Sequence, residues 1–167
     1  TSCSIIGHEN RRYVHRAGFA SLTSQCVSTF DSTMMFYKYL NPDIKKSVRV
    51  KPYKNFGWNT RKQFQDLLGN DRVYSDMSMS SVHNRSKIII CTYPETTFSE
   101  AIASGIPTIL FFSKEIYERN EVVRPLLDLL SDSKIVFYDP IELSIGQKLI
   151  VTAKHERNIV WFFLDKI

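Results

Sequence analysis

Two continuous apolar runs, separated by a short polar and helical segment, constrain the fold of this chain most strongly. The runs are Lys87–Cys91, apolar from Ile88 on, and Pro107–Phe112. A strand without alternating polar residues is buried on both faces, as strands of a parallel sheet are. Gly105 is placed to end the intervening helix, because glycine readily adopts the left-handed conformation and proline then follows. Ile88–Phe112 therefore predicts a strand, a turn, a helix and a second strand.

The remaining pattern extends this alternation over the chain. A length of 167 residues suits one domain with a substantial core. We expect 1–167 to form a single Rossmann-like domain, with three α/β/α layers and a mostly parallel sheet. Residues 1–27 are weakly patterned and are interpreted as a linker or a region shared with a preceding domain; within them, SIIG at residues 4–7 is compatible with a strand end. The other expected helices are Thr29–Leu40, which Asn41-Pro42 ends, Thr60–Leu68, Glu115–Val123, Pro125–Leu130 and 156–167. Asp139-Pro140 is interpreted as a cap and first helical position, followed by an apolar helical repeat at Ile141, Ile145, Leu149 and Ala153. The other expected strands are Ser47–Val50, Arg72–Ser75 and Lys134–Tyr138.

Charge and composition exclude several classes of function. The net charge of +5 suits an anionic small molecule or peripheral contact with an acidic membrane surface. No dense Lys/Arg block indicates a nucleic-acid interface, and no apolar run approaches the length of a membrane span. The three cysteines are far apart and no His, Cys or Asp spacing typical of a metal site occurs, so no metal is expected. Three widely spaced cysteines fit a protein of the reducing cytoplasm.

The first candidate site is the polar turn between the two apolar runs. Ligands of open α/β sheets bind outside the carboxyl ends of the strands, and a helix N-terminus there attracts phosphate. Glu100 is suited to accept from sugar hydroxyls. A second interpretation is structural, with Thr97 and Glu100 forming a capping box. The candidate residues are Thr92, Glu95, Thr96, Thr97 and Glu100.

The second candidate site follows an earlier strand. Alternation puts Arg49 and Lys51 on one face, where they are suited to hold a phosphate or carboxylate. The alternative is an edge strand with solvated basic residues. Trp58 is suited to stack on a base or sugar, or else to cover the edge of the core. Arg119 and Arg124 have two interpretations as well, as ligands at the sheet edge or as part of a solvated helix face.

These motifs resemble a known family. The segments VRVKPY, FGW, TYPETTFSEAIASGIPTILFF and VRPLLDLL, over residues 47 to 165, resemble the C-terminal, donor-binding half of GT-B type glycosyltransferases. Within that class they are most similar to bacterial surface-polysaccharide enzymes such as O-antigen and Kdo transferases. The resemblance implies a metal-independent transferase and a nucleotide-sugar donor, CMP- or UDP-linked. The acceptor would be a glycan or glycolipid, and the catalytic base would lie on a missing N-terminal domain.

Carried onto this chain, the resemblance assigns roles to individual residues. Arg49 and Lys51 would face the donor phosphate, Thr92, Thr96 and Thr97 would line the nucleotide pocket, and Glu100 would hold donor hydroxyls. Relatives often have His-Pro or Tyr-Pro after the basic strand, whereas this chain has Tyr53-Lys54, which leaves the role of Tyr53 open.

Three functions fit the sequence. The first is the donor-binding domain of a glycosyltransferase in lipopolysaccharide O-antigen or capsule synthesis, acting in the cytoplasm or at the inner face of the membrane. The second is a non-catalytic Rossmann-like module that binds a ligand or partner. The third is a GT-B relative that epimerises its sugar.

Overall fold

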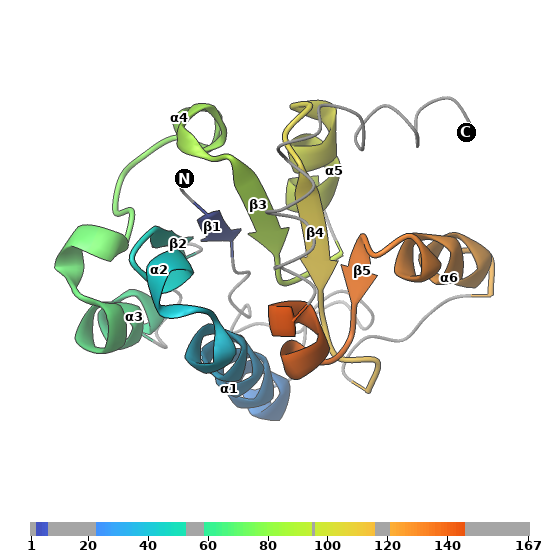
Figure 1. Cartoon of the computed structure of the whole chain (residues 1–167), viewed down its shortest axis with the longest axis horizontal. Coiled ribbons are helices and arrows are strands. Elements are labelled where there is room, and N and C mark those ends of the chain that lie inside the picture. Colours follow the sequence, from blue (N-terminus) through green and yellow to red (C-terminus); the bar gives the residue numbers. More distant parts are fainter. Residues whose placement is uncertain (1–2, 7–22, 53–58, 95, 116–120, 146–167) are drawn as a thin grey trace.

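Five parallel strands form one sheet at the centre of the molecule (Figure 1), in the order β2-β1-β3-β4-β5. The computed structural model describes residues 3–6, 23–52, 59–94, 96–115 and 121–145. The strands are β1 (Cys3–Ile6), β2 (Val48–Lys51), β3 (Ile88–Cys91), β4 (Thr108–Phe111) and β5 (Val136–Phe137). The helices are α1 (Thr23–Tyr39), α2 (Pro42–Lys45), α3 (Thr60–Leu68), the 3-10 turn η1 (Asn70–Arg72), α4 (Met79–Arg85), α5 (Thr96–Ala103) and α6 (Arg124–Asp132).

The sheet is covered on both faces. On one face, Val50, Ile90 and Phe111 pack with side chains of α1 and α3. On the other, Ile89 and Leu110 pack with side chains of α4, α5 and α6. Figure 1 shows these helices around the sheet. The predicted Rossmann-like α/β/α architecture is therefore confirmed.

The amino-terminal stretch contributes to the centre of this sheet. β1 lies within residues 1–27 and pairs in parallel with both β2 and β3. The first residues of α1 also fall in this stretch, which sequence patterning associated with a linker. The sequence indicated only a strand end at SIIG, because four residues are too few for a periodic signal, and the pairing shows that β1 lies inside the sheet. The helix expected at 156–167 lies outside the described residues.

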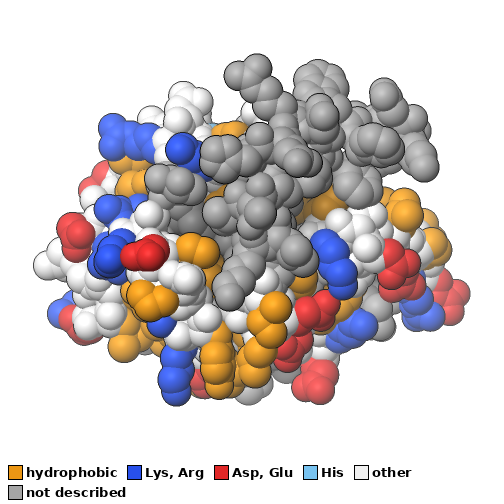
Figure 2. Space-filling view, in the orientation of Figure 1, with side chains coloured by type: hydrophobic (Ala, Val, Ile, Leu, Met, Phe, Trp, Pro, Cys, Tyr) orange, Lys and Arg blue, Asp and Glu red, His pale blue; other side chains and the backbone are white. Residues whose placement is uncertain are grey.

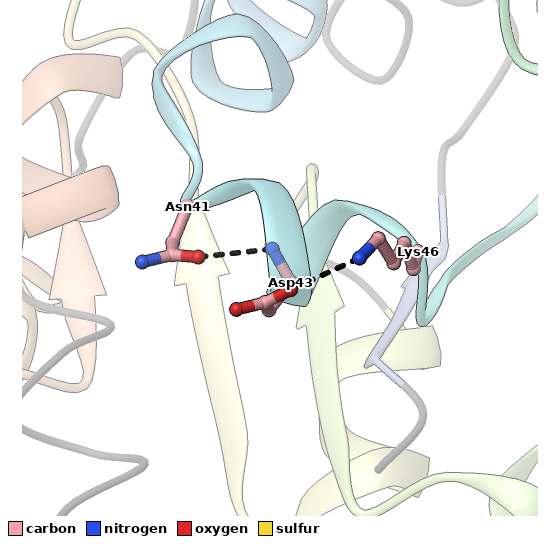
Figure 3. Close-up of polar contacts among 3 residues, drawn as sticks. All are labelled: Asn41, Asp43 and Lys46. Carbon is pink, nitrogen blue, oxygen red and sulfur yellow. Dashed lines mark hydrogen bonds and ion pairs between the residues drawn. The ribbon is translucent and has the colours of Figure 1, made fainter.

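Local capping explains where several helices begin. Asn41 accepts a hydrogen bond from the Asp43 backbone N–H at 2.9 Å, and Pro42 opens α2 in its first turn. Lys46 Nζ lies 3.1 Å from the Asp43 carboxylate (Figure 3), an exposed contact that adds little stability. The Asn41-Pro42 pair ends one helix, as predicted, and also starts the next. Ser78 caps α4 in the same way through the Ser81 N–H.

Some predicted elements differ from the observed ones. Arg72–Ser75 is not a strand, because η1 occupies its start and only Val73 forms a bridge, to Val50. The described ends of Glu115–Val123 are turns rather than helix. Lys134–Tyr138 is reduced to β5, because Lys134 has a left-handed φ of 59° that closes α6. The Ile135 N–H donates to the Leu130 carbonyl at 2.9 Å across that closure.

Within the described residues, the apolar repeat after β5 does not mark the buried face; its members Leu149 and Ala153 lie outside those residues. Ile141 and Ile145 are exposed, whereas Leu143 is buried against the face of the sheet that α1 also covers. Asp139 does cap this helical segment, since its carboxylate accepts from the N–H groups of Ile141 and Glu142. The four-residue spacing is correct for a helix, but two large aliphatic residues lie on its solvent side.

Gly105 closes α5 in the left-handed conformation, as predicted, with φ of 71°. A Cβ added there would meet no heavy atom within 4 Å, so only the backbone opposes substitution. We expect Gly105→Ala to lower the free energy of unfolding by about 1 kcal/mol. Gly105→Asn should lose less, because asparagine tolerates this conformation. Urea unfolding measures both, and a Gly105→Ala variant as stable as wild type would contradict this account.

Candidate functional site

The strand order reverses beside β1. The connection after β1 leads to β2 on one side, and the chain later returns to place β3 on the other side. Val73 forms a parallel bridge to Val50 of β2. From β1 the chain thus adds β2 and Val73 in one direction and β3, β4 and β5 in the other, which is the strand order of Rossmann-like domains. Ile6 and Cys91 are paired, so β1 and β3 end at the same level. The crevice outside these two carboxyl ends is where such sheets bind ligands.

The polar turn predicted as a site lies at this reversal. Thr92 directly follows β3 and is buried. α5 begins four residues later at Thr96, which is exposed, while Thr97 is half-buried. Thr97 precedes the buried Ala101 by one helical turn, so it lies on the side of α5 that faces the sheet. The structure therefore brings Thr92, Thr96 and Thr97 together at the carboxyl edge, with the first N–H groups of α5.

Glu100 lies further along α5 and is exposed. It follows Thr96 by four residues and shares its face of the helix, about 6 Å along the axis. A capping box of Thr97 and Glu100 predicts Phe98 as the first helical residue, whereas α5 begins two residues earlier, at Thr96. Glu95 lies outside the described residues.

The two basic residues of β2 lie on one face of the sheet, but their side chains reach different ends of the strand. Lys51 is in register with Ile6, and thus level with Cys91, so it reaches the carboxyl edge. Arg49 instead donates from Nη1 to the carbonyl oxygens of Lys46 and Val48, at 3.1 and 3.0 Å. These acceptors lie at the amino end of the strand, so this geometry departs from the expected pair of cations at one rim. Strand alternation decides the face of a residue, not the direction in which a long side chain extends.

Lys51 meets a cation that the sequence analysis did not single out. Its Nζ lies 3.3 Å from the Ser75 carbonyl oxygen, and Arg61 Nη2 lies 2.9 Å from the same atom. The pKa of Lys51 is lowered, chiefly by desolvation, then by the charge of Arg61, with Asp76 acting in the opposite direction. Figure 2 shows Lys and Arg side chains, with some Asp and Glu, over the end of the molecule that carries α2 and α3. Arg61 carries no local sequence signal, because only folding brings α3 beside Ser75.

The other proposed residues are placed as follows. Tyr53, Trp58 and Arg119 lie outside the described residues. Arg124 is exposed at the first position of α6. Lys114, after β4, lies with its ammonium 4.2 Å from the ring centre of Tyr138, a second cation near the edge that the sequence did not indicate. The sequence predicts isolated surface histidines, because none has metal-site spacing or a local carboxylate partner. His83 departs from this prediction, since it is buried on α4.

Two features are absent from the described part of the chain. Among its residues, no three His, Cys, Asp or Glu side chains are grouped so as to hold a metal ion. None of the described helices combines the length and apolar character needed to cross a bilayer.

Fold and edge together define a Rossmann-like α/β domain with a polar edge at its strand reversal. The profile of one protein family, described as the LIC12162 family transferase, matches residues 4–148. The chain belongs to this family of transferases, since the match covers most of its length. Comparison with curated proteins gives no match.

Cys91 directly precedes Thr92 of the candidate site, and its buried environment opposes nucleophilic chemistry. Burial raises the pKa of its thiol from 9.0 to about 12. We expect negligible alkylation of Cys91 by iodoacetamide at pH 8 in the folded protein and complete alkylation in denaturant. Peptide mapping separates it from Cys3 and Cys26. The same shift stabilises the fold below the pKa of the unfolded thiol, and this contribution is lost as pH rises toward about 12. Rapid labelling of native Cys91 would show that the thiol is accessible and ionised.

Proposed function

We propose that this chain is the donor-binding half of a GT-B type glycosyltransferase, which binds a nucleotide-activated sugar at the carboxyl edge of its sheet. The observation that carries the proposal is the position of Thr92 and the start of α5 at the strand reversal. Membership of a transferase family supports group transfer rather than ligand sensing alone. The resemblance of VRVKPY and TYPETTFSEAIASGIP to GT-B motifs supports a sugar donor.

The roles of individual residues follow from their places at the edge. Thr97 and the first N–H groups of α5 are suited to bind the donor phosphate, because a helix N-terminus carries partial positive charge. Thr92 and Thr96 line the nucleotide pocket, and Glu100 accepts hydrogen bonds from donor hydroxyls. Lys51 lies at the same edge and compensates phosphate charge. Arg49 joins it only if its guanidinium leaves the carbonyl groups of Lys46 and Val48.

The proposed reaction is direct transfer to a hydroxyl group. The acceptor oxygen bonds to the anomeric carbon of the sugar, while the bond from that carbon to the phosphate oxygen breaks and its electron pair goes to the phosphate. Cations at the edge stabilise the charge that develops on this leaving group. The acceptor proton passes to a general base on a partner domain that faces this edge.

The cellular setting proposed with this reaction is bacterial surface-polysaccharide synthesis. The donor is CMP- or UDP-linked, and the acceptor is a growing glycan or a glycolipid. The reaction takes place in the cytoplasm, at the inner face of the membrane when the acceptor is lipid-linked. A net charge of +5 is compatible with loose contact of the protein with acidic lipid headgroups.

Thermal-shift measurements with CMP, UDP, GDP and ADP test this proposal. A nucleotide at about 100 times its dissociation constant should stabilise the folded chain by roughly 2.7 kcal/mol. Thr97→Val should weaken binding of the most stabilising nucleotide about fivefold, because the substitution removes a hydroxyl group at nearly constant side-chain volume. Ser99→Ala is the matched control, an exposed residue of the same helix, and should bind like wild type. If none of the four nucleotides stabilises the protein, the donor pocket is wrong and the non-catalytic module becomes the better description.

A further inference from the structure

Two cations from different elements converge on one backbone oxygen beside the end of β2. The ammonium of Lys51 and the guanidinium of Arg61 both contact the Ser75 carbonyl, at 3.3 and 2.9 Å. Their two nitrogen atoms are therefore no further apart than the sum of those distances. A carbonyl oxygen has two lone pairs and no net charge, so it accepts from both groups without neutralising either.

The charges around this oxygen are incompletely balanced. Lys51 is half-buried, and both its desolvation and the nearby Arg61 lower its pKa. Asp76 is the carboxylate that opposes these effects. Among the described residues, two cations thus face one acidic group, which leaves an excess of positive charge in that part of the carboxyl edge.

The start of α3 adds to this excess. Arg61 and Lys62 lie in its first turn, and no acidic residue does. Cations at a helix N-terminus oppose the helix dipole, whereas an anion there is stabilised. The side-chain pair and the helix therefore favour the same kind of ligand. The dipole alone would not identify a site, but it adds to the convergence of Lys51 and Arg61.

We propose that Lys51 and Arg61 together bind a phosphoryl group of the donor, with Arg61 as a ligand that the GT-B motifs of this chain do not include. This inference rests on the proposed function, because it takes the phosphoryl group from the nucleotide sugar. A phosphate group offers several acceptor oxygens to two cations on different elements. The two side chains exchange their shared carbonyl for separate phosphate oxygens, and Asp76 limits the affinity by repulsion.

Titration with pyrophosphate at constant ionic strength tests the pair directly by calorimetry. Lys51→Met and Arg61→Met should each weaken pyrophosphate binding about tenfold, since each removes a charge-assisted hydrogen bond. Lys62→Met is the control on the same helical turn, because the Lys62 ammonium is paired with Asp66 and exposed; it should change binding less than about twofold. Asp76→Asn should tighten binding several-fold, because it removes the competing carboxylate.

Circular dichroism and thermal unfolding establish that each variant folds. If Arg61→Met does not fold, Arg61→Lys replaces it and should still weaken binding several-fold, since lysine lacks the planar fork of donors. The proposal that Lys51 and Arg61 bind phosphate together is overturned if pyrophosphate binding is unchanged in Lys51→Met or in the Arg61 variant. An equal loss of binding in Lys62→Met also overturns it.

Parallel titrations with uridine, cytidine, UDP and CMP separate this inference from the proposed function. If a nucleotide binds equally well to wild type and to Arg61→Met, the donor pocket stands and the pair is overturned. If pyrophosphate binding depends on the pair but no nucleotide binds, the assignment to a nucleotide-sugar donor is overturned while the anion site remains. Support for both requires that UDP or CMP binds more tightly than its nucleoside and loses that advantage in Lys51→Met and Arg61→Met.

Discussion

Parallel pairing of five strands is the constraint on which the rest of this structure depends. A parallel sheet needs crossover connections and apolar cover on both faces. All four residues of β3 are buried, which leaves no room for polar side chains within that strand. Helices pack on both faces, so polar groups at this strand are displaced to its ends. Thr92 follows at once where β3 finishes.

The order of the strands then selects one part of the edge. β1 is flanked by β2 and β3, and the chain reverses direction across the sheet at that point. The carboxyl ends of these strands lie level through the pairing of Ile6 with Lys51 and with Cys91. This register is what places a basic residue and a polar helix start on one side of the molecule. Membership of a transferase family agrees with a ligand-binding role for that side.

The two basic residues of β2 show what a local sequence pattern can predict and what it cannot. The alternation of β2 correctly indicated that Arg49 and Lys51 share a face. Arg49 nevertheless contacts carbonyl groups at the amino end, because the Lys46 and Val48 oxygens are within reach of its side chain. Lys51 extends to Ser75, 24 residues away, where it meets Arg61. No spacing in the sequence reveals that the two cations meet, since the Ser75 carbonyl that joins them lies 24 residues after Lys51 and 14 residues after Arg61.

The sequence alone determined the elements whose physical cause is local. The apolar run of β3, the left-handed glycine at Gly105 and the cap at Asp139 were all predicted, because each depends on residues within one or two turns of chain. Tertiary structure decided the central position of β1, the reduction of Arg72–Ser75 to a single bridge and the exposure of Ile141. It also decided which cations meet. These features depend on contacts between segments distant in sequence, and only the folded sheet brings those segments together.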